Sequence, residues 1–227
     1  MSSTDQGLAV DVGAWLFAGL SVVFFLLYTL ASPRAYNVRS VAFSAVIVSA
    51  VTSAVNFAQL DGISLFIRSD GAVIYWLEWA GYSVSLFFIG FSLRRFLSPT
   101  ATEGEAAVSG IALSVVGLGG LLGLFASRFE KTAQGAAYGL TSFVYVVWIV
   151  QSWRATEQPG KRWVLVYFVA ATLFYLVGYF FGPPLLTCWS ASTEKTLYLI
   201  GNVFTKALLP FIEMIFHNGA VQKPVYS

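Results

Sequence analysis

The sequence predicts an all-α membrane protein, built as a bundle of seven transmembrane helices. Its 227 residues are 57% hydrophobic and only 11% charged, with a mean hydropathy of +0.74, whereas a soluble domain carries about 25% charged residues. Polar punctuation divides the chain into seven apolar segments, each close to the roughly 20 residues that a spanning helix needs. The helices must satisfy their polar groups against one another, which indicates a single domain over residues 1–227.

The expected helices are separated by short loops, which leave no room for a second domain. The first follows Met-Ser-Ser-Thr-Asp-Gln-Gly, which lacks the basic stretch of a signal peptide and therefore favours a retained helix. The seven spans are expected at about 10–31, 38–59, 72–93, 107–127, 133–153, 163–182 and 196–218.

The distribution of basic residues predicts the orientation, because cytoplasmic loops are enriched in Lys and Arg. One set of loops carries eight of them and the opposite set four, with Lys206 inside the last span as the thirteenth. The eight are Arg34, Arg39, Arg94, Arg95, Arg154, Lys161, Arg162 and Lys223, and the four are Arg68, Arg128, Lys131 and Lys195. The N-terminus is therefore expected outside and the C-terminus in the cytoplasm.

The same inventory argues against several classes of function. A net charge of +2 is too small to imply a nucleic-acid partner, and a single cysteine, Cys188, forms no internal disulfide. With one histidine, no metal-ligand cluster and no phosphate-binding loop, the chain is expected to be neither an enzyme nor a metal protein.

Lys206 lies near the middle of the last apolar segment. A lysine at the centre of a membrane helix costs about 2.5–3.5 kcal/mol on insertion scales, so it needs a partner or a chemical role. Condensation with an aldehyde would supply both by forming a Schiff base. Only two acids, Glu78 and Glu213, fall well inside expected spans; the bland alternative is a structural lysine paired with Glu78.

Helical spacing places further polar residues beside Lys206. At about 100° per residue, Asn202 lies about 40° away from Lys206 around the helix, and Glu213 and His217 about 20° away on either side. We expect this stripe to face the bundle interior, with Pro210 interrupting it. Alternatively, Glu213 and His217 only reach the cytoplasmic interface.

The residues of the last segment resemble helix seven of the microbial (type 1) rhodopsins, seven-helix proteins that bind retinal through a lysine. The family pattern ends in acid-Val-small-small-Lys, which Val203, Thr205 and Lys206 match. Phe204 is bulky where the family has a small residue, and Asn202 replaces the acid. Glu194 matches an outer glutamate of the family, which suggests a candidate outer proton group.

Helices five and six extend the resemblance. The family's helix six has aromatic-x-x-Tyr-Pro-x-x-aromatic followed by Leu-Ile-Gly, and here Phe168 and Tyr175 supply the aromatics before Leu-Val-Gly. Ala171 and Thr172 replace the Tyr-Pro pair. Tyr138 to Ser142 resembles, more weakly, the stretch beside the ring end of retinal.

Two registers are open for helix three, whose family motif is Arg-Tyr-x-Asp-Trp. The preferred register aligns Glu78 with the aspartate counterion and Trp79 with the tryptophan. Tyr82, Ser83 and Leu86 would then line the chromophore. The competing register matches Ile74-Tyr75-Trp76 to a tripeptide earlier in the family's helix. It puts Glu78 one turn too far out, with Gly81 at the counterion position.

The resemblance implies a light-absorbing protein with all-trans retinal on Lys206, Glu78 as the counterion and proton acceptor, and Asn202 beside it. Tyr75 stands at the arginine position and Ile89 at the usual cytoplasmic donor position, which argues against a typical outward proton pump. Glu213 offers a substitute cytoplasmic proton group.

Light-driven proton or ion translocation is therefore the expected function, and photosensing through a separate partner protein is the alternative. A retinal-free transporter or membrane enzyme is the third reading. Expected surroundings are a lipid bilayer in a prokaryotic cell membrane, with a homo-oligomer or signalling partner as candidates.

Overall fold

A computed structural model of the chain describes residues 4–31, 36–63, 65–67, 73–126, 131–181 and 191–219. Over these residues the chain crosses the bundle seven times, as the sequence predicts. The first six crossings are α1 Thr4–Leu30, α2 Tyr36–Leu60, α3 Trp76–Leu97, α4 Glu103–Ala126, α5 Lys131–Ala155 and α6 Arg162–Phe181. The seventh consists of α7 Ala191–Asn202, a π-helical segment η2 Val203–Leu208, and α8 Leu209–Gly219.

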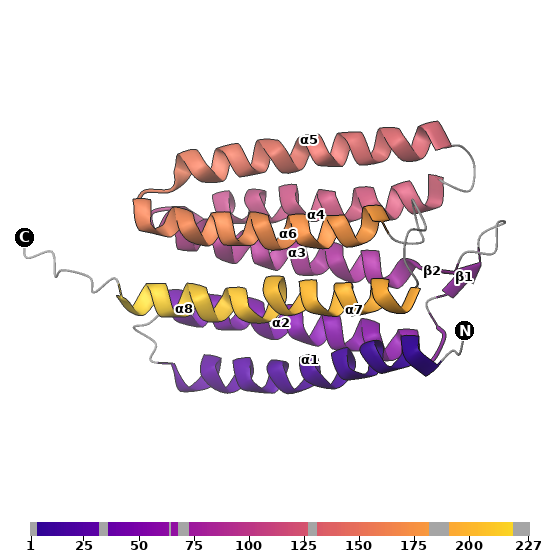
Figure 1. Cartoon of the computed structure of the whole chain (residues 1–227). Coiled ribbons are helices and arrows are strands. Elements are labelled where there is room, and N and C mark those ends of the chain that lie inside the picture. The colour runs from indigo at the N-terminus through magenta and orange to yellow at the C-terminus, as the bar shows by residue number, and fades with distance from the viewer. Residues whose placement is uncertain are drawn as a thin grey trace, which may run out of the picture.

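Neighbouring helices in the chain pack side by side (Figure 1). α1 packs on α2, α2 on α3, α3 on α4 and α4 on α5, while α7 contacts both α1 and α6. α5 and α1 lie at opposite edges of the bundle in Figure 1. The start of α1 and the end of α8 lie at opposite ends, as an odd number of crossings requires.

The third crossing differs from the expected span of 72–93. Residues Val73–Tyr75 form strand β2, which pairs antiparallel with β1 Leu65–Ile67, and the helix runs instead from Trp76 to Leu97. Val, Ile and Tyr suit a strand as well as a span, so hydropathy alone does not separate the two. The last turn keeps Arg94 and Arg95 in the helix, 3.6 Å from Glu105 and Glu103 of α4 respectively.

Large apolar side chains cover the outside of the bundle, including Trp15 (65% exposed), Phe143 (67%) and Trp163 (73%). Such a surface suits lipid, because exposing this much apolar surface to water is unfavourable. Among the described residues, four stretches have the length and hydropathy of a span: Gly7–Leu30, Val38–Leu60, Glu103–Leu122 and Lys195–Phe216. The protein is an integral membrane protein.

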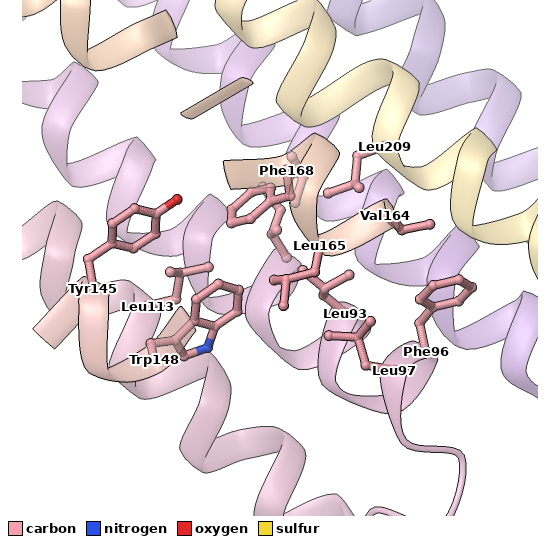
Figure 2. Packing of buried hydrophobic residues seen from close by; sticks show 12 residues of the cluster. Leu93, Phe96, Leu97, Leu113, Tyr145, Trp148, Val164, Leu165, Phe168 and Leu209 are labelled. Atoms are coloured by element: carbon pink, nitrogen blue, oxygen red, sulfur yellow. The ribbon is translucent and has the colours of Figure 1, made fainter. Parts of the chain in front are cut away.

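The interior is packed with aromatic and aliphatic side chains from every crossing except the first (Figure 2). Trp148 of α5 meets Phe168 of α6 edge to face, with ring centroids 5.7 Å apart. Leu93 and Phe96 of α3 and Leu209 of α8 belong to the same cluster and are at most 1% exposed. This core fixes α3 and α8, which carry Ser92 and Glu213 of the polar interior described below.

One end of the bundle gathers most of the described basic residues. α3 and α5 finish there, and α4 and α6 begin there. Two hydrogen bonds connect the chain around the end of α3 with the loop between α5 and α6. Lys161, in the short helix η1 Pro159–Lys161, donates to the carbonyl of Phe96 at 2.7 Å, and Glu157 accepts from Ser98 at 2.5 Å. The basic residues at this end are Arg39, Arg94, Arg95, Arg154, Lys161 and Arg162.

Candidate functional site

Lys206 lies inside the bundle and is only 4% exposed. Its Nζ donates to Thr52 Oγ1 of α2 at 3.2 Å and lies 4.1 Å from the centroid of the Tyr82 ring of α3. Thr52 in turn donates to the carbonyl of Val48 at 2.7 Å. Over the described part of the chain Lys206 forms no ion pair, so the amine is held by a neutral oxygen and an aromatic face.

The helix around Lys206 is locally widened. Val203–Leu208 forms a π-helical turn, a feature that is frequent at functional sites. Pro210 has no N–H to donate to the carbonyl four residues earlier, which is that of Lys206. The missing hydrogen bond gives a physical reason for the regular helix to break at this place.

Tyr82 joins the third and seventh crossings at the same level. Its hydroxyl donates to Asn202 Oδ1 at 2.9 Å, and the two residues are 8% and 7% exposed. The bond orients the Tyr82 ring beside the amine of Lys206 and holds Asn202 as an acceptor.

Glu78 forms an ion pair that the sequence analysis did not foresee. Its Oε2 lies 2.8 Å from Nζ of Lys195, and the side chains are 14% and 8% exposed. The expectation that Lys195 lies in an outer loop is wrong, because this residue lies in the second turn of α7. A signal was present, because 11 residues are about three helical turns and so place Lys195 on the same side of the helix as Lys206.

Two small cavities continue from Lys206 to this ion pair. Each has a volume of about 10 Å³, close to the space that one water molecule needs. Glu78, Asn56 and Asn202 line both of them. The first is lined by Thr52, Val55, Asn56, Glu78, Gly81, Tyr82, Asn202 and Lys206, and the second by Ala9, Val10, Asn56, Gln59, Glu78, Lys195, Tyr198, Leu199 and Asn202.

The contacts of α3 bear on its register. Tyr82, one turn after Glu78, is the residue of this helix that touches the amine of Lys206. Gly81 lines the same cavity and packs so closely on α2 that an added Cβ would lie 2.6 Å from Val55 Cγ2. Gly81 and Glu78, the residues that the two registers place at the counterion position, both line the cavity of Lys206. The register of α3 therefore stays a prediction.

Glu213 occupies the other side of Lys206, seven residues further along the crossing, and is 2% exposed. Ser92 of α3 donates to its Oε2 at 2.6 Å. The carboxyl group therefore lies in the packed interior, and the alternative that it only reaches the interface is wrong.

The remaining residues that were predicted to contact the chromophore differ in how far they are buried. Phe168, Ala171 and Ser83 are buried, Leu86 packs against the core cluster, and the Trp79 ring lies against Gly120 of α4. Ser142 is exposed, whereas its neighbour Thr141 is buried. Ser142, expected beside the ring end of retinal, therefore lies on the outer side of α5. The side chains of Tyr138, Tyr175, Glu194 and His217 lie outside the described residues.

Comparison with known proteins shows which solved structures share this fold. No family model matches the sequence, and no curated protein matches it. Among solved structures, schizorhodopsin 4 superposes with a TM-score of 0.77 at 21% identity, over 92% of this chain and 98% of that one. The chain has the microbial rhodopsin fold.

Two further structures with this fold superpose equally well. Halorhodopsin, a light-driven chloride pump, gives a TM-score of 0.81 at 16% identity, over 96% of this chain and 98% of that one. The thermophilic rhodopsin from Rubrobacter xylanophilus gives 0.82 at 13% identity, over 94% and 96%. Sequence identities this low support the rhodopsin fold only. The chemistry of the site therefore depends on this chain's own residues.

Proposed function

We propose that this protein is a light-driven, ion-translocating retinal protein, with Lys206 as the residue that carries the chromophore. The observation that carries the proposal is the buried amine of Lys206, which lies on a π-helical turn against a neutral hydroxyl and an aromatic ring. A membrane-buried amine without an ion pair is costly unless it has a chemical role. The neighbouring folds include light-driven chloride and proton pumps, which supports transport as the outcome.

Aromatic and small side chains near Lys206 would border an elongated ligand. Tyr82 would lie beside the attachment point, and Phe168 and Ala171 of α6 would supply the wall further along. When bound, all-trans retinal supplies visible absorption and a photoisomerisation. The protein supplies the positions at which a proton can be held: Nζ of Lys206, the carboxylate of Glu78 and the carboxyl group of Glu213.

Glu78 would serve as the counterion, and Lys195 modifies how it does so. Lys195 already pairs with Glu78 at 2.8 Å, so one carboxylate faces two cations when the linked Lys206 nitrogen is protonated. The charge of Lys195 weakens the hold of Glu78 on that proton.

Proton movement toward the basic end of the bundle is the direction that we favour. Glu78 on the other side is engaged by Lys195, whereas among the described residues Glu213 accepts from a neutral hydroxyl donor, Ser92. A neutral donor leaves a carboxyl group able to gain or lose a proton without breaking an ion pair. By the distribution of Lys and Arg, this direction is inward.

The first experiment is an absorption spectrum of the purified protein with and without all-trans retinal, comparing wild type with Lys206→Ala. We expect a visible band in wild type only. Vesicles that hold the protein should then show a light-induced pH change whose sign gives the direction. Absence of a visible band in wild type would overturn the proposal, and a band with no pH change would favour photosensing.

A pair of variants tests the roles of Glu78 and Lys195. Glu78→Gln should move the band to longer wavelength or abolish it at neutral pH, because the counterion is lost. Lys195→Met should move it to shorter wavelength and preserve it to higher pH, because Glu78 then serves one cation. Shifts of the same sign would sink this assignment, and Lys195→Arg is the matched control that keeps the charge.

A further inference from the structure

A groove opens at the basic end of the bundle, between the first two turns of α4 and the last two turns of α5. Its volume is about 740 Å³, within the range of about 300–1,000 Å³ that is usual for ligand sites. None of its lining residues borders either cavity beside Lys206. The groove is lined by Arg94, Thr102, Gly104, Glu105, Val108, Ser109, Trp148, Gln151, Ser152, Arg154 and Ala155.

The deep end of the groove is closed by a hydrogen-bonded chain across three helices. Trp148 Nε1 of α5 donates to Ser109 Oγ of α4 at 2.9 Å, and Ser109 donates to the carbonyl of Gly90 of α3 at 3.1 Å. This chain fixes the helices that form the groove. Val108, 66% exposed, makes its lipid-facing wall apolar.

The mouth of the groove carries more positive than negative charge. Arg94 from α3 and Arg154 from α5 approach it from two sides, with Glu105 as the acid in the lining. The Glu105 carboxylate is held by its own helix end, since its Oε2 accepts from the N–H and Oγ1 of Thr102 at 2.8 and 3.0 Å. Arg94 forms an ion pair with Glu105 at 3.6 Å, and because a guanidinium has five N–H donors, a paired arginine can also bind an added anion.

Space is available next to these charges. A Cβ on Gly104 would find a single neighbour within 4 Å, Thr102 Oγ1 at 3.9 Å. The first turn of α4 therefore leaves the groove open beside its backbone N–H groups, where the helix dipole favours negative charge. The groove therefore combines an apolar, lipid-facing wall with guanidinium groups at its mouth. This combination is complementary to an amphiphile with an anionic head group.

We propose that this groove binds an anionic phospholipid, with its phosphate between Arg94 and Arg154 and an acyl chain along Val108. Arginine is suited to this role because its planar fork binds phosphate oxygens in pairs. Basic pockets between helices at the cytoplasmic side are also where anionic lipid head groups bind. The site is separate from the proposed retinal site and does not depend on retinal.

The test is native mass spectrometry of the detergent-purified protein with phosphatidylglycerol or phosphatidylcholine added at equal concentration. Wild type should retain phosphatidylglycerol preferentially, and Arg154→Gln should lower that retention about tenfold, the scale of one charge-assisted hydrogen bond. Gly104→Leu should lower retention of both lipids because the side chain fills the groove. Arg39→Gln is the matched control, since Arg39 lies at the same end but stacks on Tyr28 of α1.

Three outcomes would overturn the proposal. One is equal retention of phosphatidylglycerol by wild type, Arg154→Gln and Gly104→Leu. Another is equal binding of free glycerol phosphate, which would mean a phosphate site without a lipid. The third is a dimer that dissociates on Gly104→Leu, which would identify the groove as a contact between copies. Because Arg94→Gln also removes a contact between α3 and α4, it is used only if its thermal unfolding matches wild type.

Discussion

At the scale of single residues, Glu213 is the group to test, because it either transfers protons during transport or is a buried structural acid. Glu213→Gln keeps the size of the side chain and its contact with Ser92, but it can no longer exchange a proton. We therefore expect the late steps of the photocycle to slow by about 10²-fold, the lower end of the usual range of about 10²–10⁴-fold for positioned acid–base groups. Flash photolysis of the retinal-bound protein measures this directly.

Ser92→Ala provides the accompanying control. It removes the 2.6 Å hydrogen bond to Glu213 while leaving the carboxyl group in place. We expect a smaller change in the same late steps. If Glu213→Gln and wild type decay at the same rates, Glu213 is a buried structural acid.

The sequence predicted some residues of the site and not others, for identifiable reasons. Lys206 and Asn202 stand out because a polar group inside an apolar segment is costly, which indicates that it has a partner or a function. Lys195 was missed because it lies at a span's edge, where a basic residue is ordinarily read as a loop residue. The outward position of Ser142 could not be predicted, because a weak motif does not fix rotation and one residue turns a helix by about 100°.

At the scale of elements, the close contact of α3 and α4 depends on glycines. A Cβ on Gly110 would lie 2.6 Å from the carbonyl oxygen of Phe87, a backbone atom that moves only with its helix. We expect Gly110→Ala to destabilise the protein by about 1–3 kcal/mol, the usual effect of overpacking. Gly139→Ala on α5 meets nothing within 4 Å and should be neutral or stabilising by up to about 1 kcal/mol. Thermal unfolding of both variants in the same detergent gives the comparison, and equal losses would contradict it.

The loop between α5 and α6 gives the second prediction at this scale. Hydrogen bonds from Ser98 and then Thr100 hold the pKa of Glu157 below its ordinary value. A carboxyl group with a lowered folded-state pKa adds stability above its unfolded pKa, about 4, and that stability is lost as the pH falls through the folded pKa. Glu157→Gln should therefore flatten the dependence of thermal stability on pH below about pH 5. Asp61→Asn, at the opposite end of the bundle, is the control, and parallel curves for Glu157→Gln and wild type would refute the effect.

Helix boundaries were less predictable than helix number. Hydropathy identifies apolar length, so it gave the seven crossings, but it read β2 as the start of a helix and ended α3 before Arg94 and Arg95. Those arginines extend the helix because α4 places Glu103 and Glu105 opposite them. The π-helical turn at Lys206 depends on backbone hydrogen bonding next to Pro210 and leaves no mark on hydropathy.

At the scale of the whole molecule, Lys206 is placed where a linked chromophore would tie the crossings together. Its side chain contacts α2 through Thr52 and α3 through Tyr82, and Phe168 of α6 faces the same interior. A ligand that binds only the folded protein stabilises it, by about 2.7 kcal/mol at 100 times its dissociation constant. For a protein of this size that corresponds to a rise in Tm of roughly 5–10 °C.

We therefore expect all-trans retinal to raise the Tm of wild type, followed by circular dichroism at a fixed heating rate. The covalent linkage requires the amine, so retinal should leave the Tm of Lys206→Ala nearly unchanged. Retinol, which has no aldehyde, separates the linkage from simple filling of the interior and should stabilise both proteins equally and weakly. An equal rise with retinal in wild type and in Lys206→Ala would mean that binding occurs without Lys206. In that case retinal would stabilise the bundle only by filling its interior. The buried amine of Lys206 would then need another role, such as transport of a different ion.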